Sequence, residues 1–370
     1  MLLVAGCSRE FAQGPVDSSS GQEISFRTMG GATKSAVSGT VFPQGYDILV
    51  SAYHNPVSAS GADYFEGIPF GYDAVSGSWK SEKGPKYYPM EGTLDFLAVA
   101  SAGYNSADAG IVPTADWGES DNAAKKAVLT VPDNSAKFDD LMYGAANGCS
   151  SGTAGSALVL RHAMTSVVFF AKSNVAYDAS TNTGITITGI TLDGAKFSGT
   201  LTVSNPSAGG GSGDLTAAWS SLGDQKDHIA ARVWNSANSG VLTNESALSA
   251  LQLSTTAGSL STAPFGEAYV ILPPQAAVPF TISYTIHNGF ASDGTTPVDT
   301  QFQTQITPSG NWDMEKKNVY AITINGDDAP VVIPTVIEWD LSDGSNEMII
   351  TLFSGDNSST GGGDFNQEWE

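Results

Sequence analysis

The sequence is poor in basic residues and has no long apolar run. Its 370 residues include 38 Asp or Glu but only 16 Lys or Arg, which gives a formal net charge of −22. A negative field of this size repels phosphate backbones and anionic lipid surfaces, so we exclude nucleic-acid binding. The chain also lacks a run of about 18 apolar residues, so we expect no membrane-spanning helix.

Candidate catalytic and metal-binding side chains are scarce. The four histidines form no spaced pair, and the sequence has no Cys/His cluster and no nucleophile elbow. We therefore expect no catalytic residue, no metal site and no cofactor, and we do not expect an enzyme. His162 lies in an apolar stretch and is predicted to be a core histidine, whereas Asp139 and Asp140 are expected to be solvated turn residues.

What the sequence does contain is typical of an extracellular β-protein. Hydrophobic residues make up 41% of the chain, charged residues only 15%, and there are 41 glycines. This composition provides enough apolar surface for cores and many turns between strands. The length exceeds one typical domain, so we expect two.

Cys7 and Cys149 are the two cysteines, and Cys7 follows the small residues Val4-Ala5-Gly6. A disulfide between the cysteines is one interpretation. The other, which we favour, is a bacterial lipobox in which Cys7 is acylated and becomes the new amino terminus. Only Met1-Leu2-Leu3 precede this motif, so we expect the natural chain to begin upstream.

The stretch Glu23–Met29 is predicted to be a short half-buried strand. Ile24, Phe26 and Thr28 alternate with polar residues, which is the two-residue period of a β-strand. A glycine pair follows it at once, and glycine pairs mark flexible breaks.

Two basic residues mark sites in this region where a trypsin-like protease can cut. Arg27 lies within the strand and Lys34 lies just after the glycine pair. A strand beside a cleavable hinge is either an ordinary first strand or a removable one. The remainder of the chain favours a removable strand.

Runs of alternating, β-branched and aromatic residues predict strands along most of the chain. The run Ala157–Lys172 predicts one central strand or two strands joined by a bend near 163–166. Residues 55–92 are expected to be a long connection, and residues 121–127 to include short helical turns. The other predicted strands are Tyr46–Tyr53, Leu94–Ala100, Gly184–Leu192, Lys196–Val203, Ala268–Leu272, Phe280–His287, Gln301–Ile306, Val319–Ile324 and Val331–Trp339.

The last apolar segment, Glu347–Phe353, predicts a strand that is apolar on both faces. It is either the last strand of its own domain or a strand meant for another molecule. We favour the second interpretation, because an uncovered apolar edge strand needs a partner. Its apolar residues are Met348, Ile349, Ile350, Leu352 and Phe353.

Together these pieces resemble the fimbrillin family of Bacteroidales, the subunits of type V pili. Each piece is weak alone, and their order along nearly the whole chain carries the resemblance. The pieces are Val4–Cys7, Glu23–Lys34, Tyr46–Tyr53, Leu141–Gly144, Leu160–Val167, Tyr269–Gln275, Lys317–Ile324 and Ile337–Trp339.

The resemblance implies an all-β fold of two tandem transthyretin-like β-sandwich domains. It also implies export as a lipoprotein, removal of the first strand by a protease and polymerisation by strand exchange. Mapped onto this sequence, the cut follows Lys34 or Arg27, and Glu347–Phe353 of the next subunit is the donor strand. The expected layout is 1–7 lipobox, 8–34 tether and removable strand, 35–176 and 177–345 sandwiches, and 346–370 donor strand and tail.

The expected partners are other fimbrillin subunits, a trypsin-like processing protease, and a host receptor or glycan. The expected location is the outer membrane for the lipoprotein precursor and the cell-surface fimbria after processing. Two alternatives stay open: a tip or anchor subunit of the same pilus, and a surface glycan-binding lipoprotein with Trp117 as a sugar-stacking residue.

Overall fold

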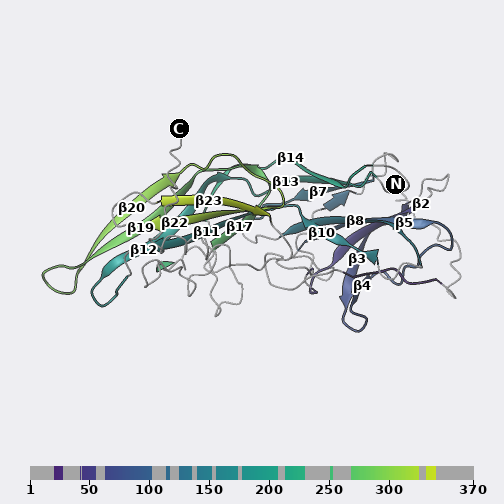
Figure 1. Cartoon of the computed structure of the whole chain (residues 1–370), viewed down its shortest axis with the longest axis horizontal. Coiled ribbons are helices and arrows are strands. Elements are labelled where there is room, and N and C mark those ends of the chain that lie inside the picture. The colour runs from purple at the N-terminus through teal and green to yellow at the C-terminus, as the bar shows by residue number, and fades with distance from the viewer. Residues whose placement is uncertain are drawn as a thin grey trace, which may run out of the picture.

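The computed structural model describes most of the chain between residues 21 and 338. All 23 regular elements in this part are strands, which confirms the prediction of an all-β fold. Figure 1 shows an elongated molecule with the earlier strands at one end and the later strands at the other. No helix in this part of the chain is long and apolar enough to cross a membrane. The described residues are 21–27, 42, 44–55, 63–101, 114–116, 125–135, 140–151, 156–173, 177–206, 213–229, 251–252, 268–324 and 331–338.

The largest sheet has eight strands. They are β1 (Ser25–Arg27), β2 (Ile48–Asn55), β3 (Asp63–Asp73), β4 (Ser78–Ser81), β5 (Thr93–Ser101), β8 (Leu141–Cys149), β9 (Ser156–Ala157) and β10 (Val159–His162). Their order in space is β10-β8-β5-β2-β3-β4-β1-β9.

The two ends of this sheet meet in one segment of chain. β9 and β10 follow one another directly, separated only by Leu158, and we call 156–162 the closing segment. Its first part pairs in parallel with β1, and its second part pairs antiparallel with β8. The sheet is therefore curled into a closed ring of strands, and β1 completes the ring between β4 and the closing segment.

Four further sheets contain the remaining strands, in the orders β14-β13-β7-β6, β17-β11-β22-β23, β15-β12-β19-β20 (with β16 on β12) and β18-β21. Their bounds are β6 (Thr114–Asp116), β7 (Lys126–Val131), β11 (Thr165–Ser173), β12 (Thr183–Ala195), β13 (Gly199–Ser204), β14 (Thr216–Ser220), β15 (Lys226–Ile229), β16 (Leu251–Gln252), β17 (Ala268–Leu272), β18 (Gln275–Ala276), β19 (Phe280–Phe290), β20 (Pro297–Ile306), β21 (Asn311–Trp312), β22 (Lys316–Ile324) and β23 (Val331–Glu338).

Strands β2 and β5 are buried on both faces because they lie between two apolar clusters. Ile48 and Phe96 belong to the cluster inside the curled sheet, together with side chains of β1, β3 and β4. Their neighbours Leu49 and Leu97 point the other way, into a cluster that continues through β7 and β13 to the later sheets. Successive side chains of a strand point to opposite faces, so both faces of these strands must be apolar.

After Ala157, the last residue of β9, the predicted run Ala157–Lys172 forms two strands, β10 and β11, with a bend between them, as one of the two interpretations predicted. β10 ends at His162, and β11 begins at Thr165. β11 is a central strand, because it pairs antiparallel with β17 and in parallel with β22. The division of the chain at 176/177 and the transthyretin-like form of each half stay predictions.

Two expectations were wrong. Residues 55–92 are not a mere connection, because they contain β3 and β4, which form a hairpin in the eight-stranded sheet. Two glycines and Pro69 within β3 disguised its two-residue period, and β4 spans only four residues. Lys126 and Ala127 lie in β7 rather than in helical turns, and Ala127 is buried.

Candidate functional site

The middle of the predicted removable strand forms β1, and the two apolar side chains described in this stretch are fully buried. Ile24 and Phe26 have no exposed surface. The ring of Phe26 makes edge-to-face contacts with Phe70 of β3 and Phe96 of β5, each with a centroid distance of 5.0 Å. β1 thus places one aromatic side chain in the centre of the cluster inside the curled sheet.

The backbone of β1 is bonded on both edges, but over a short length. Two residue pairs join it to β4, Ser25 with Lys80 and Phe26 with Trp79, and two more join it to β9. Just before the strand, the Ile24 amide donates to the carbonyl of Lys86 at 2.6 Å, and Gln22 accepts from the Tyr88 amide at 3.1 Å. Side-chain burial, more than strand length, holds β1 in the sheet.

A small charged cluster joins Glu23, which lies just before β1, to the hairpin of β3 and β4. Lys80 Nζ is 3.0 Å from Asp73 Oδ2 and 3.9 Å from Glu23 Oε2. The Ser76 hydroxyl and then Lys80 lower the pKa of Asp73 to about 2, and the bond to Asp73 raises the pKa of Lys80. The pair with Glu23 is long and half-exposed, so it contributes little to holding β1.

Removal of β1 would open a groove in the sheet. The floor of this groove would be Phe70 and Phe96, and its walls would be the freed edges of β4 and β9. Burying two large apolar side chains stabilises by roughly 1.5–3 kcal/mol each, and a buried polar group left without its hydrogen bond costs about 1–3 kcal/mol. An empty groove is therefore unfavourable, and another apolar strand can refill it.

The structure places only part of the predicted site. Phe26 and the backbone of Arg27 lie in β1, and Ile24 lies immediately before it; the side chains of Ile24 and Phe26 are buried, as the alternation predicted. Thr28, Lys34, Cys7 and Trp117 lie outside the described residues. The five apolar residues of the predicted donor strand also lie there: Met348, Ile349, Ile350, Leu352 and Phe353.

The backbone pairing of Arg27 bears on the choice between the two predicted cleavage sites. Arg27 pairs with Ala157 of the closing segment. A protease binds its substrate as an extended, accessible strand, so cleavage after Arg27 requires β1 to detach first. This pairing makes Lys34 the better candidate.

The buried polar residues show one confirmed and one wrong expectation. His162 is 1% exposed, which confirms the prediction of a core histidine. Its Nδ1 lies 2.8 Å from Asp140 Oδ2, and Asp140 is fully buried rather than solvated.

Cys149 is buried, and its thiol donates to the Asn147 carbonyl at 3.8 Å. No group of three or more metal-ligating side chains occurs among the described residues.

Sequence reasoning missed the surroundings of β1. Phe70 and Trp79 come from a region without a clear strand signal, and Lys80 comes from the same region. The alternation of Ser78-Trp79-Lys80 beside a turn glycine, Gly77, was the available signal. It spans too few residues to identify a strand by period alone.

Solved structures that match the chain include fimbrial proteins. One is a fimbrial protein from Bacteroides vulgatus, with 14% identity over 85% of this chain and 100% of that chain and a TM-score of 0.48. Another is the tip fimbrial protein of Porphyromonas gingivalis with a C-terminal truncation, with 11% identity over 86% and 100% of the two chains and a TM-score of 0.40. No match was found among curated proteins.

The comparison with protein families covers most of the sequence. The sequence profile described as fimbrillin-like matches residues 33–339, which include all the described strands except β1. This match confirms the resemblance seen in the sequence. The chain belongs to the fimbrillin-like family.

Proposed function

We propose that this chain is a shaft subunit of a type V fimbria that assembles by donor-strand exchange and serves adhesion. It is a structural protein rather than an enzyme. Cys7 anchors the precursor to the outer membrane, a trypsin-like protease removes the segment ending at Lys34, and the mature subunit joins others at the cell surface. The observation that carries this proposal is that β1, only three residues long, closes the largest sheet, while Phe26 within it and Ile24 just before it are fully buried.

The predicted donor strand has the pattern that the vacated groove requires. Met348, Ile350 and Leu352 repeat the two-residue spacing of Ile24 and Phe26. The donor supplies at least three apolar side chains for the face where β1 supplies two, and each contributes roughly 1.5–3 kcal/mol when buried. The longer strand also pairs more backbone groups along β4 and the closing segment.

Before cleavage, β1 keeps the subunit from assembling by strand exchange. It is covalently tethered to its groove, so its effective concentration exceeds that of any free donor strand. Cleavage at the hinge removes this advantage, because the released peptide dissociates and is diluted. Processing is thus the switch from a subunit with a filled groove to one that can polymerise by strand exchange.

Deletion of residues 347–370 tests the donor assignment. We expect the truncated protein to keep the thermal unfolding and circular dichroism of the full chain, because the groove is filled by its own β1. After processing it forms no filaments in negative-stain microscopy, while the processed full chain does. Filaments formed by the truncated protein would refute the donor assignment.

A processing-resistant variant tests the proteolytic switch separately. We expect Arg27→Gln with Lys34→Gln to leave a monomer that trypsin cannot shorten at the hinge. When this variant is mixed with the processed full chain, its groove should not accept a donor strand, because β1 still fills it. Filament yield equal to that of the wild type would refute the requirement for processing.

A further inference from the structure

β20 forms one edge of its sheet, at the end of the molecule opposite β3 and β4 (Figure 1). It pairs with β19 along one side, from Phe280 with Ile306 to Phe290 with Pro297. No strand in the described part of the chain pairs with its other side. The ten residues of β20 therefore offer a row of backbone donors and acceptors to a further strand.

This edge lacks the usual protection against pairing with another chain. Edge strands are commonly guarded by lysine, by an internal proline or by an inward bulge. β20 has its only proline at its first position, and it has no lysine or arginine. Its pairing with β19 is regular from residue 299 to residue 306.

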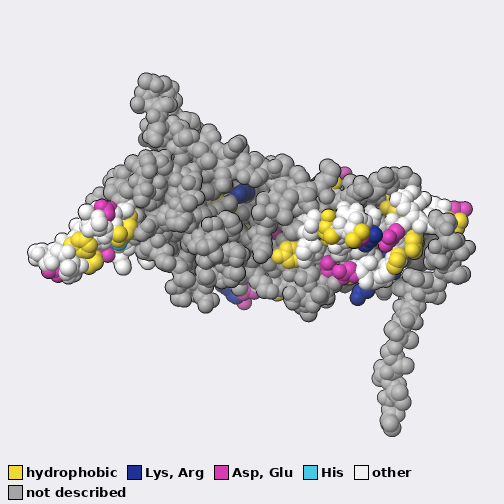
Figure 2. Space-filling model, turned by 90° about the horizontal axis from the view of Figure 1, so that it is seen from below, with side chains coloured by type: hydrophobic (Ala, Val, Ile, Leu, Met, Phe, Trp, Pro, Cys, Tyr) yellow, Lys and Arg dark blue, Asp and Glu magenta, His cyan; other side chains and the backbone are white. Residues whose placement is uncertain are grey.

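Figure 2 shows side chains at this end of the molecule, where yellow, white and magenta atoms stand clear of the body and no dark blue is seen. The exposed apolar side chains here include Phe290 and Val298, which are 36% and 42% exposed. Exposed β20 residues such as Gln301 and Gln303 follow along the same strand. The edge is thus open to solvent over much of its length.

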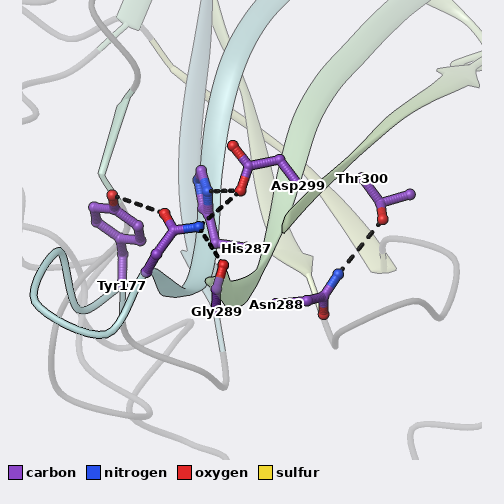
Figure 3. Close-up of polar contacts among 7 residues, drawn as sticks. Tyr177, His287, Asn288, Gly289, Asp299 and Thr300 are labelled. Atoms are coloured by element: carbon purple, nitrogen blue, oxygen red, sulfur yellow. Dashed lines mark hydrogen bonds and ion pairs between the residues drawn. The ribbon is translucent and has the colours of Figure 1, made fainter. Parts of the chain in front are cut away.

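The only charge on β20, Asp299, is bound by side chains of its own sheet region: His287 of β19 and Asn182, just before β12. Asp299 Oδ1 accepts from Asn182 Nδ2 at 3.0 Å and lies 2.9 Å from His287 Nδ1 (Figure 3). The Asn182 bond and then the histidine lower the pKa of Asp299. Thr300, which follows Asp299, accepts a hydrogen bond at its hydroxyl from Asn288 Nδ2 at 3.4 Å. These contacts fix the start of β20 and give the Asp299 carboxylate hydrogen-bond partners within its own chain.

The sequence of β20 is nearly the same in both directions. Residues 298–306 read Val-Asp-Thr-Gln-Phe-Gln-Thr-Gln-Ile, which is close to a palindrome centred on Phe302. Two antiparallel copies related by a two-fold axis at Phe302 place Gln301 opposite Gln303 and Thr300 opposite Thr304. Val298 then lies opposite Ile306, and Asp299 lies opposite Gln305.

We propose that the β20 edges of two copies of this chain pair antiparallel about Phe302, so that their sheets become continuous. In this register each residue keeps its face, because all paired positions differ by an even number of residues. The glutamine amides pair as both donor and acceptor, the threonines face each other, and no like charges are opposed. The interface is isologous, as a two-fold dimer requires.

The second copy is the occupant that the strand itself specifies. A foreign peptide would not explain the near-palindrome, whereas self-pairing about a two-fold axis does. The contact is small and weak for isolated monomers. If the proposed fimbrial function is right, subunits repeated along a shaft present many such edges, and two shafts associate laterally through their combined contacts.

Disulfide trapping tests the register in the unprocessed full chain, where strand exchange plays no part. Directly opposed residues of antiparallel strands have Cα atoms about 4.5–5.5 Å apart, within the range for a disulfide. A mixture of Gln301→Cys and Gln303→Cys should form a disulfide-linked heterodimer under mild oxidation. The wild-type protein under the same oxidant reports any background from Cys7 and Cys149.

The control is a mixture of Gln303→Cys and Gln305→Cys. In the proposed register Gln303 lies opposite Gln301 of the other copy, four residues from Gln305. The two cysteines are then about 14 Å apart along the strand, so no heterodimer should form. Both mixtures use exposed glutamines of one strand, so they differ only in register. Equal cross-linking in both mixtures, or none in the first, would overturn the proposal.

Charge substitution provides a second measurement. Gln301→Lys with Gln303→Lys opposes two pairs of like charges in the dimer, and we expect at least a tenfold loss of self-association in sedimentation experiments. Mixing it with Gln301→Glu and Gln303→Glu should restore a heterodimer. Thr216→Lys with Ala218→Lys adds the same charge to another edge strand, β14, and should leave self-association unchanged. A wild-type chain with no concentration-dependent association would also refute the proposal.

Discussion

Replacing Phe26 by alanine measures how strongly side-chain burial holds β1 in the sheet. The ring is fully buried and lies 5.0 Å from both Phe70 and Phe96. Truncation of a buried phenylalanine costs about 3–5 kcal/mol. β1 has only two residue pairs on each edge, so we expect most of this cost to fall on the attachment of β1 rather than on the whole sheet.

The assay is cleavage after Arg27 by dilute trypsin, followed by intact mass, with Lys34→Gln present in every protein compared so that the tether of β1 stays intact. Arg27 is paired with Ala157 in the closed sheet, so cleavage there reports the detached population of β1 when the protease is limiting. A cost of about 3–4 kcal/mol corresponds to a detached population roughly 10²–10³-fold larger. The Phe26→Ala variant should be cut faster by that factor while its circular dichroism stays that of the folded protein.

Phe280→Ala is the matched control. Phe280 is also fully buried, and its ring lies 5.0 Å from Phe169 and from Tyr320, but in the other apolar cluster. It removes the same atoms from similar aromatic surroundings. We expect Phe280→Ala to lower the free energy of global unfolding by about 3–5 kcal/mol. Its cleavage rate at Arg27 should stay near that of the wild type. Equal acceleration in both variants would refute the claim that Phe26 holds β1 locally.

Two polar contacts give further predictions. The Tyr143 hydroxyl donates to Glu315 Oε1 at 2.6 Å, so Tyr143→Phe should lower the free energy of unfolding by about 1.5 kcal/mol in urea titrations. Burial and then Glu315 raise the pKa of Tyr143 above the usual tyrosine value of 10.0. The stability that the Tyr143 hydroxyl contributes is therefore present below pH 10.0 and is lost as the pH rises above that value. The Tyr143→Phe variant should not show this loss. The Thr296 hydroxyl and backbone amides lower the pKa of Asp293 to about 2, so the turn gains stability that is present above pH 3.8 and is lost as the pH falls through 2. A carboxyl titration by NMR with its midpoint near the usual 3.8 would contradict this assignment.

The sequence predicted strands well where one period extends over many residues. β2, β5, β12, β19 and β22 each span eight or more residues and contain long apolar or alternating runs. The composition and the order of the motifs also identified the family. These signals are local, so they do not depend on which strands become neighbours.

The closure of the largest sheet could not be predicted in this way. It depends on a closing segment of seven residues, 156–162, that pairs with β1 on one side and β8 on the other. Those partners are about 130 and 15 residues away in sequence, and no local pattern specifies such pairings. β3 was missed because glycine and proline interrupt its pattern, and β4 because it spans only four residues, although Phe70 of β3 contacts Phe26 and Trp79 of β4 lies in the same cluster.

The burial of Asp140 shows a different limit. A pair of aspartates before a strand is typical of a solvated turn, yet Asp140 is fully buried against His162. The two residues are 22 positions apart, and only the pairing of β8 with β10 brings them together. Polar residues become buried when a partner is supplied by the tertiary fold, which a single stretch of sequence does not show.

The most direct test of the removable strand is mild trypsin treatment of the purified monomer, followed by intact mass and negative-stain microscopy. We predict a single new amino terminus at Ser35, immediately after Lys34, together with ladders or filaments that the uncleaved protein does not form. A clean cut at this position that leaves only monomers would contradict assembly by strand exchange.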